Sequence, residues 1–341
     1  MPDGWNVGVS TSAAVVLSPN ISCDGFHRPA KTRVQTHAHL DHRDGFATSK
    51  GHGAIVCLSG TRDLMIAELN ADLPYRGNFI ALEPGEEFGL EDGFVQLFDS
   101  HHMLGSAQVL VQGRDGYRTG YSGDFGWPTT PIEVDELVVD GTCSPATIRN
   151  YSQEDAEEAF AELAVSRVRT GPVVTYADLE SVYRGISVLA RFDDWPVIVD
   201  EKISRYSETY ARHGLPVPQL LTLGTEEAES AMGENRYFLF RTKGAGRIDY
   251  GDAATYLSLI SFYTTPDNPV AEITGNYFQV GISNHADFEQ TVSYVEGTGA
   301  AKVLVDNYRG RRAGELALAL EERLSVETSF ELERPPKLGV R

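Results

Sequence analysis

The sequence predicts an α/β protein with more than one folding unit, and three observations support this expectation. Short strand-like runs such as Phe94–Phe98 and Glu136–Val139 end in loops that contain acidic residues and histidines. From about Tyr151 the pattern changes to amphipathic helices alternating with short strands, which is typical of βα units around a parallel sheet. The length of 341 residues also exceeds that of most single cores.

The first part of the chain is expected to be rich in strands. Ser12–Ser18 has the apolar character of a buried strand and is followed by the turn residues Pro19 and Asn20. Thr32–Thr36 and Ala54–Leu58 are also strand-like. The next segment, Gly60–Ala71, has the apolar spacing of a helix.

The middle of the chain predicts a separate unit. Ser152 is a good N-cap for a helix that extends toward Gly171, and Pro172–Tyr176 is a strand. Leu179–Phe192 is expected to be a helix, and the alternation continues through Lys202–His213. We therefore expect an inserted unit over about residues 150–270, between a first part (1–149) and a return segment (271–341).

The charge is strongly negative. The chain has 49 acidic and 29 basic residues, a net charge of −20, and only six of the basic residues are lysine. Such an acidic surface would ordinarily argue against a nucleic-acid partner, whose phosphates are bound by lysine and arginine. An acidic, lysine-poor surface also stays solvated in concentrated salt, which favours a salt-loving archaeal source over an ordinary acidic protein.

Other features set limits on the class of protein. No run of about eighteen apolar residues is present, and the N-terminus lacks the basic and apolar regions of a signal peptide, so a cytoplasmic protein without membrane contact is expected. Cys23, Cys57 and Cys143 are scattered and odd in number. They predict neither a disulfide framework nor a thiolate zinc site.

The segment Thr36–His42 has four ligand-type side chains within six residues: His37, His39, Asp41 and His42. In extended backbone the first three point to one side, while His42 turns away. Imidazole and carboxylate groups suit borderline divalent metals such as zinc. The pattern favours a cradle for two adjacent metal ions over the alternative, a histidine-rich surface loop.

His37-Ala38-His39-Leu40-Asp41-His42 resembles the H-x-H-x-D-H motif of the metallo-β-lactamase superfamily. The resemblance implies an αββα sandwich with two divalent ions at one edge, Zn²⁺ first and Mn²⁺ as an alternative. The superfamily contains hydrolases of thioesters, lactams and phosphodiesters, so this motif alone implies the metals and not the substrate. Asp24 matches an early aspartate that braces the metal loop in the family, but Asp-Gly is equally a common turn pair.

Further motifs follow in the order that the family shows. His102, two residues before Gly-Ser, matches the third histidine ligand, whereas His101 is then a neighbour with no metal role. Asp124 in Ser122-Gly123-Asp124 matches the carboxylate that bridges both ions. The implied sets are His37, His39, His102 and Asp124 on one side, and Asp41, His42 and Asp124 on the other.

Two later motifs resemble the β-CASP branch, whose members act on RNA or DNA. Asp140, followed by Thr142, matches an acid that lies beside a catalytic histidine. His285 in Ser283-Asn284-His285-Ala286-Asp287 matches that histidine, a general acid. The branch carries an inserted cap domain, and residues 150–270 match its place.

The last motif departs from the family pattern. Asp306 stands where many members have a metal-binding histidine, so either it replaces that ligand or the second site lacks it. Arg309, Arg311 and Arg312 follow at the start of a helix. They suit phosphate binding, but pairing with nearby glutamates such as Glu315 explains them almost as well.

Together these motifs predict a metal-dependent nuclease that acts on single-stranded nucleic acid, with RNA favoured, as in the archaeal group related to messenger-RNA 3′-end processing nucleases and to ribonuclease J. Asp41 is expected to assist at the metals, His285 to protonate the leaving oxygen and Asp140 to orient it. The alternatives are a DNA exonuclease associated with ligation or repair, a non-cleaving processing subunit, and a small-ester hydrolase. Homodimer formation is left open.

Overall fold

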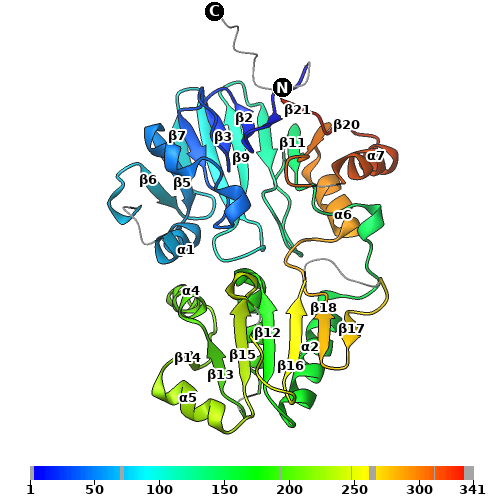
Figure 1. The fold of residues 1–341 in the computed structure, drawn as a ribbon. Coiled ribbons are helices and arrows are strands. Elements are labelled where there is room, and N and C mark those ends of the chain that lie inside the picture. The colour runs from blue at the N-terminus through cyan, green and yellow to red at the C-terminus, as the bar shows by residue number, and fades with distance from the viewer. Residues whose placement is uncertain are drawn as a thin grey trace, which may run out of the picture. The chain divides into compact units, whose positions relative to one another are not determined.

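The computed structural model describes residues 4–69, 73–192, 194–246, 248–260, 266–310 and 312–333. The chain divides into two compact units (Figure 1). Unit 1 consists of Met1–Ile148 and His285–Arg341, and unit 2 of Arg149–Asn284. Each unit is described by itself.

The first sheet of unit 1 has seven strands within the described residues. β1, β2 and β3 are antiparallel, whereas β3, β4, β5 and β6 run parallel. The helix α1 (Ser59–Leu69) packs against β5 and β6. The strand order is β21 (Leu332–Glu333), β1 (Gly8–Ser10), β2 (Val15–Ser18), β3 (Ile21–Cys23), β4 (Thr32–Val34), β5 (Ala54–Leu58) and β6 (Phe79–Leu82).

The second sheet of unit 1 also has seven strands in the described part of the chain. Its early strands form an antiparallel meander, and β10, β11, β19 and β20 run parallel. The strand order is β20 (Glu327–Ser329), β19 (Lys302–Val305), β11 (Glu136–Val139), β10 (Arg118–Tyr121), β9 (Ala107–Gly113), β8 (Gly93–Asp99) and β7 (Glu87–Leu90).

Alternation of side chains along the strands builds the layers of unit 1. In β11, Val138 packs into a core shared by both sheets, together with Val34 and Val56 of the first sheet. Its neighbours Leu137 and Val139 face the other way, toward α6 (Phe288–Thr298) and α7 (Ala313–Leu324). A strand buried on both faces needs a continuous apolar run, which Glu136–Val139 supplies after its first residue. The two sheets therefore share one core, and helices cover the outer faces (Figure 1).

Unit 2 is built around one mostly parallel sheet. Only β17 and β18 pair antiparallel among its described strands. The strand order is β14 (Leu220–Thr222), β13 (Val197–Val199), β15 (Phe238–Thr242), β12 (Val173–Ala177), β16 (Thr255–Leu259), β18 (Tyr277–Val280) and β17 (Val270–Thr274). The helices are α2 (Gln153–Val168), α3 (Leu179–Leu189), α4 (Glu201–Arg212) and α5 (Glu226–Gly233).

The helices of unit 2 begin where polar caps predict. Ser152 and Asp155 form a reciprocal capping box at the start of α2, and the Asp200 carboxylate accepts a hydrogen bond from the Ile203 amide at the start of α4. Unit 2 extends past residue 270, the boundary expected from the sequence. The reason is that β18 pairs with β16, and β17 pairs with β18, which attaches residues 270–280 to this sheet.

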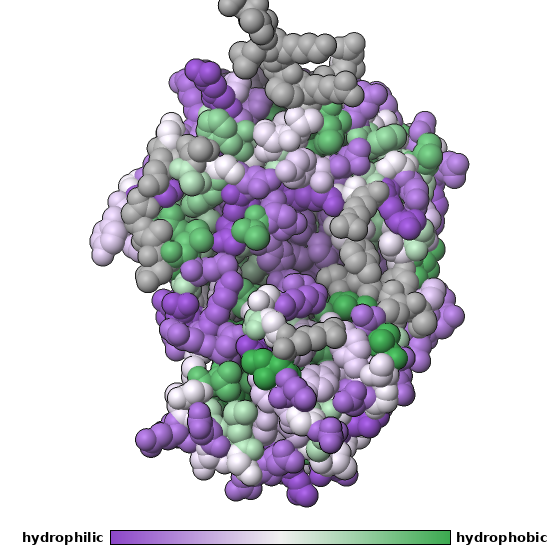
Figure 2. All heavy atoms as spheres, in the orientation of Figure 1, coloured by the Kyte–Doolittle hydropathy of each residue, from purple (hydrophilic) through white to green (hydrophobic). Residues whose placement is uncertain are grey.

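The expected α/β class is confirmed, because both units combine sheets of mixed or parallel strands with packed helices. Hydrophilic residues predominate on the face shown in Figure 2, and apolar residues form small separate patches there. Among the described helices, none combines the length and the apolar character that a bilayer crossing requires.

Candidate metal centre

The predicted site residues of unit 1 all follow the ends of strands. β8 and β10 run in the same direction because each is antiparallel to β9, and β11 and β19 are parallel to β10. Their carboxyl ends therefore lie at one edge of the second sheet, as those of β3 and β4 do in the first. The residues that follow these ends are Asp24, His37, His102, Asp124, Asp140 and Asp306.

Three imidazoles and one carboxylate from three segments form a compact cluster. The Nδ1 atom of His39 lies 3.0 Å from Nε2 of His37 and 3.2 Å from Nε2 of His102. Oδ2 of Asp124 lies 3.6 Å from Nε2 of His37 and 3.7 Å from Nε2 of His102. One ligand atom from each of these residues falls within 4.8 Å of all the others, a spacing that fits one metal ion.

His42 faces the other oxygen of Asp124. Its Nε2 atom lies 3.2 Å from Oδ1 of Asp124 and 4.0 Å from Oδ2 of Asp41, whose side chain is exposed. Among the described residues this buried Nε2 atom makes no hydrogen bond. Asp124 thus directs one carboxylate oxygen to His37 and His102 and the other to His42, which is the arrangement of a bridging ligand.

Asp24 holds the segment Thr36–His42, here called the metal loop because it carries candidate ligands. Its carboxylate accepts hydrogen bonds from the Thr36 amide at 2.8 Å and the Thr36 hydroxyl at 2.6 Å. Oδ2 also lies 2.8 Å from Nδ1 of His42. The Nδ1 contact fixes the ring so that Nε2 points toward Asp124. Of the two alternatives for Asp24, brace or simple turn, the geometry shows a brace.

The protonation of the cluster suits a cation. Burial, together with His42 and His39, holds the pKa of His37 well below its usual value, so this ring is neutral, the form that binds metal. Burial alone would raise the pKa of Asp124, but His42 and His37 hold it well below the usual range. Burial would lower the pKa of His42, but Asp124 and Asp24 raise it to about 10. A cation bound here would displace the proton on His42.

The donor set itself also fits a metal ion. It consists of imidazole nitrogens and carboxylate oxygens, with no thiolate, which suits Zn²⁺ or a similar divalent ion. Of the residues expected at the metals, His37, His39, His42, His102 and Asp124 lie together, and Asp41 lies at the exposed border.

His285 and Asp140 form a pair beside the cluster. Nδ1 of His285 lies 3.0 Å from Oδ2 of Asp140, and Nε2 lies 4.0 Å from Oδ2 of Asp124. The other Asp140 oxygen accepts hydrogen bonds from the Thr142 amide at 2.8 Å and the Thr142 hydroxyl at 2.5 Å. The carboxylate is therefore fixed, and it turns the far nitrogen of His285 toward the metal cluster.

His101 lies outside the cluster, although it adjoins His102. It is exposed and has a left-handed backbone with φ of 56°. Its Nδ1 atom lies 3.3 Å from the Thr129 hydroxyl. This turn of the backbone separates the two rings, so the structure brings His102 and not His101 to the cluster.

Asp306 and Arg309 form a buried ion pair. Nη1 of Arg309 donates to Oδ2 of Asp306 at 2.8 Å, and the Tyr308 amide donates to Oδ1 at 2.8 Å. Both oxygens are thus used, and Asp306 is absent from the candidate metal clusters of the described residues.

The Arg309 guanidinium donates hydrogen bonds within the protein and is not left open for a phosphate. Its remaining nitrogens donate to backbone oxygens, Nη2 to Ala13 at 2.9 Å and Nε to Asp41 at 3.3 Å. Arg312 pairs with Glu315 at 3.2 Å on the surface, and Arg311 lies outside the described residues.

Sequence reasoning missed two buried polar residues that shape the metal loop. The Gln35 amide donates to the backbone oxygens of His37 and His42, and the Arg33 guanidinium donates to the oxygens of His42 and Asp44. The available signal was the alternation Arg33-Val34-Gln35. Polar side chains at alternate positions of a strand usually face water, but here both are fully buried.

No family model matches the chain. Over 135 residues it is 32% identical to a protein of Acidianus ambivalens described as uncharacterised and lying in the lig 3′ region, and the match covers 38% of this chain and 96% of that protein. The chain belongs to the family of this Acidianus protein. That family assignment does not by itself give an activity.

Two more distant similarities bear on the site and the fold. Over 286 residues the chain is 25% identical to RNase aCSPSF2 of Saccharolobus solfataricus, with 72% of this chain and 57% of that protein covered. The chain thus spans little more than half of that RNase. A crystal structure of a protein of unknown function from Enterococcus faecalis superposes with a TM-score of 0.58 at 12% identity, covering 88% of this chain and 79% of that one.

Proposed function

We propose that this chain is a metal-dependent nuclease of the β-CASP branch of the metallo-β-lactamase superfamily, which hydrolyses phosphodiester bonds in single-stranded nucleic acid, with RNA as the favoured substrate. The observation that supports it most is Asp124, whose two oxygens face separate groups of imidazoles beside the His285–Asp140 pair. The distant similarity to an archaeal RNase supports the same activity.

The architecture agrees with this proposal. Two sheets that share one core, with helices on the outer faces, correspond to the αββα sandwich that the motifs imply. In this proposal, unit 2 (Arg149–Asn284) is the inserted cap domain, and the segment from His285 onward returns the chain to the sandwich.

The proposed ligands of one ion are His37, His39, His102 and Asp124, and those of the other are His42, Asp124 and Asp41. When bound by these residues, two divalent ions, Zn²⁺ or Mn²⁺, would supply Lewis acidity toward a phosphoryl oxygen and would lower the pKa of a bound water. The protein residues fix the geometry: Asp24 orients His42, and Asp124 joins both groups of imidazoles.

His285 is the proposed proton donor. Asp140 holds Nδ1 of its ring, so that a proton on Nε2 points toward the cluster, where the leaving oxygen of the substrate needs it. Asp41 has an exposed side chain at the border of the site, and in this proposal it assists at the second ion.

A second candidate is a DNA exonuclease of the same branch associated with ligation. One observation favours it, since the Acidianus relative is described by its place in the lig 3′ region. RNA and DNA of one sequence, end-labelled or circular, distinguish the two candidates and show whether cleavage requires an end.

The proposed roles predict unequal losses. His39→Gln and Asp124→Asn should lower the metal content, measured by plasma mass spectrometry, and abolish cleavage. His285→Ala should leave the metal content unchanged and slow cleavage by about 10²–10⁴-fold, the usual contribution of a positioned acid. His101→Ala is the matched control and should behave like the parent protein. Cleavage of both nucleic acids at the parental rate by the His39→Gln variant would disprove the proposal.

A further inference from the structure

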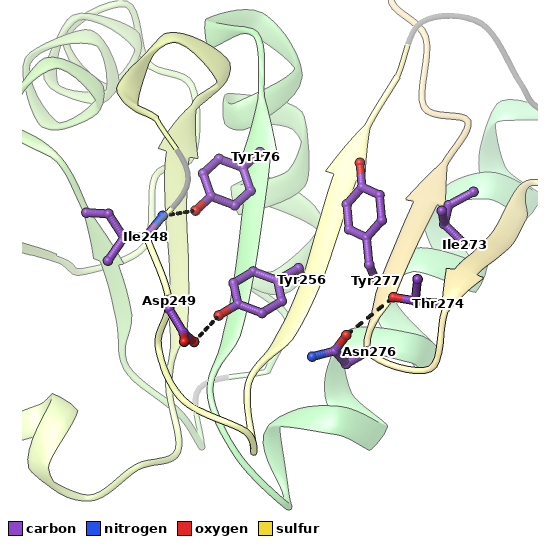
Figure 3. A pocket seen from close by; sticks show the side chains of 8 residues that line it. All are labelled: Tyr176, Ile248, Asp249, Tyr256, Ile273, Thr274, Asn276 and Tyr277. Carbon is purple, nitrogen blue, oxygen red and sulfur yellow. Dashed lines mark hydrogen bonds between the residues drawn. The ribbon is translucent and has the colours of Figure 1, made fainter.

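Unit 2 has a pocket of about 620 Å³ on one face of its sheet. Figure 3 shows three tyrosines at its centre, with Ile248 and Asp249 on one side and Ile273 and Thr274 on the other. The lining residues are Tyr176, Ile248, Asp249, Tyr256, Ile273, Thr274, Asn276 and Tyr277.

The tyrosines come from three neighbouring strands. Tyr256 of β16 is the direct cross-strand partner of Tyr277 of β18. Tyr256 also pairs with Val174 of β12, and Tyr176 lies two residues further along that strand, on the same face. The sheet therefore places three aromatic rings next to one another.

The opposite face of this sheet is covered. The apolar side chains of α2 and α3, including Phe160 and Ile186, pack there against Val173 and Leu257. In Figure 3 the pocket lies in front of the strands. On this side Ala228 of α5 packs with Tyr176 and Leu239 in a smaller apolar cluster. On the pocket face Tyr176 is buried, but Tyr256 and Tyr277 are only half-buried. A parallel sheet is usually covered on both faces, so aromatic side chains that remain partly exposed beside a pocket suggest a ligand.

Hydrogen bonds fix the floor of the pocket. The Tyr176 hydroxyl accepts from the Ile248 amide at 3.3 Å, and the Tyr256 hydroxyl accepts from the Tyr250 amide at 2.9 Å. The Tyr256 hydroxyl also donates to Oδ1 of Asp249 at 3.3 Å. The rings of Tyr176 and Tyr256 are thus held in place before a ligand arrives, which reduces the entropy that binding costs.

The walls are apolar and the rim is polar. Ile248 and Ile273 expose 47% and 49% of their surface. Oδ1 of Asp249 accepts from Tyr256 and from the Gly251 amide, and within the described part of the chain Oδ2 has no hydrogen-bond donor. Among the lining residues that the structure describes, none is lysine or arginine. This chemistry suits a planar, uncharged group with a hydrogen-bond donor on its edge, and it disfavours a phosphate.

We propose that this pocket binds a nucleobase with an exocyclic amino group, such as adenine or cytosine, in a single-stranded nucleic acid. The proposal rests on the nuclease function proposed above and names the group by which the substrate is held. Figure 3 shows the faces of the tyrosine rings turned to the viewer, who looks onto the sheet, so a flat base stacks on them. Oδ2 of Asp249 accepts the amino group, as acidic side chains do from cytosine.

The test measures binding to the full-length, metal-free protein, in which cleavage does not interfere. Fluorescence anisotropy is recorded for a labelled hexa-adenylate RNA and for an abasic ribose-phosphate oligomer of equal length. Tyr256→Leu and Tyr277→Leu should each weaken binding of hexa-adenylate about tenfold, and neither should change binding of the abasic oligomer, because only stacking is lost.

Three further variants control for misfolding and test the choice of base. Ile273→Glu changes an exposed wall residue and should weaken hexa-adenylate binding by a similar factor without affecting the fold. Tyr75→Leu is the matched control, because Tyr75 is 90% exposed and belongs to unit 1. Asp249→Asn should reduce the preference for hexa-adenylate over hexa-uridylate.

The outcomes separate this proposal from the proposed nuclease. Loss of hexa-adenylate binding in the pocket variants of a protein that cleaves nothing would uphold the pocket and disprove the nuclease. Normal cleavage with unchanged hexa-adenylate binding in Tyr256→Leu and Ile273→Glu would disprove the pocket alone. Competition by tetramethylammonium but not by adenosine would also overturn it, because the rings would then form a cage for a cation.

Discussion

At the residue scale, the candidate site is a cluster of buried charges that compensate one another. Asp24, Asp124 and Asp306 are buried carboxylates, and a buried ion is tolerated only when it is paired. Arg309 compensates Asp306, and protonated His42 lies between Asp24 and Asp124. In the metal-free protein, the positive charge of protonated His42 therefore partly neutralises the two carboxylates beside it, as a bound divalent cation would.

The brace on His42 gives a prediction about stability. Asp24→Asn removes the charge but keeps a residue type that tolerates the left-handed backbone of this position, where φ is 59°. Losing one partner of a buried pair should lower the free energy of unfolding of the metal-free protein by about 3 kcal/mol. Urea denaturation measures it, with Asp92→Asn, an exposed hydrogen-bond acceptor, as the control.

The effect of Asp24→Asn should also depend on pH. Burial alone would raise the pKa of Asp24, but contacts with His42 and Thr36 lower it by more than burial raises it. The net shift of the pKa is therefore downward. A depressed carboxyl pKa stabilises the fold above the unfolded value of about 4, and this contribution is lost as the pH falls through the folded value. The difference between the parent and the variant should therefore shrink in acid. A difference that stays constant below about pH 4 would show that the charge of Asp24 is not what stabilises the fold.

Residue spacing predicted part of this site and could not predict the rest. His37 and His39 were identified because ligand-type side chains are dense in their segment, and His102 and Asp124 because their motifs resemble those of a known family in the same order. The role of Arg309 could not be identified from the sequence. Its partners Ala13, Asp41 and Asp306 come from three segments, two of them far from Arg309 along the chain. A surface phosphate site and an internal contact look the same in a sequence of arginines.

At the element scale, strand direction decides which loops meet. The carboxyl ends of β8, β10, β11 and β19 share one edge. The sequence predicted strands at β8 and β11, but not the order of the four strands in the sheet. The sequence also did not predict which unit β18 belongs to. Tyr277–Val280 is strand-like in either unit, and only its pairing with β16 assigns it to unit 2.

Arg309 connects the loops after β19 and β4 with the turn before β2, so its replacement should loosen the metal loop. Arg309→Lys keeps the charge but loses the planar group that reaches Asp306, Asp41 and Ala13 together. Unsatisfied buried oxygens should then lower the free energy of unfolding by about 1–3 kcal/mol. Metal affinity should fall as well, which isothermal titration with Zn²⁺ measures.

Arg312→Lys is the matched control for this change. Arg312 lies three residues along the same segment, but its pair with Glu315 is exposed, and exposed pairs contribute about 0–1 kcal/mol. We expect no measurable loss of stability or metal affinity in this variant. If Arg309→Lys also left the free energy of unfolding and the Zn²⁺ affinity unchanged, the guanidinium of Arg309 would not be what holds the metal loop (Thr36–His42) in place.

At the scale of the whole molecule, charge dominates. A net charge of −20 on 341 residues repels itself in the folded state, and hydrophilic residues predominate on the face shown in Figure 2. The chain has 49 acidic and 29 basic residues, so lysine and arginine cannot pair with all of its carboxylates. Screening by dissolved salt is therefore needed to weaken the repulsion between carboxylates that the few lysines do not neutralise.

This predicts a protein that salt stabilises in a particular way. The screening length falls from about 10 Å at 0.1 M salt to about 3 Å at 1 M, so repulsion is relieved mostly at the low end of this range. The melting temperature should rise steeply with the first additions of NaCl and then level off. A general effect of salt on apolar hydration would instead grow steadily with concentration. Differential scanning calorimetry of the metal-free protein in NaCl, with sucrose as the uncharged control, separates the two. A melting temperature that rises equally with sucrose, or in a straight line with NaCl, would mean that exclusion of the solute from the surface, rather than repulsion between carboxylates, limits the stability of this fold.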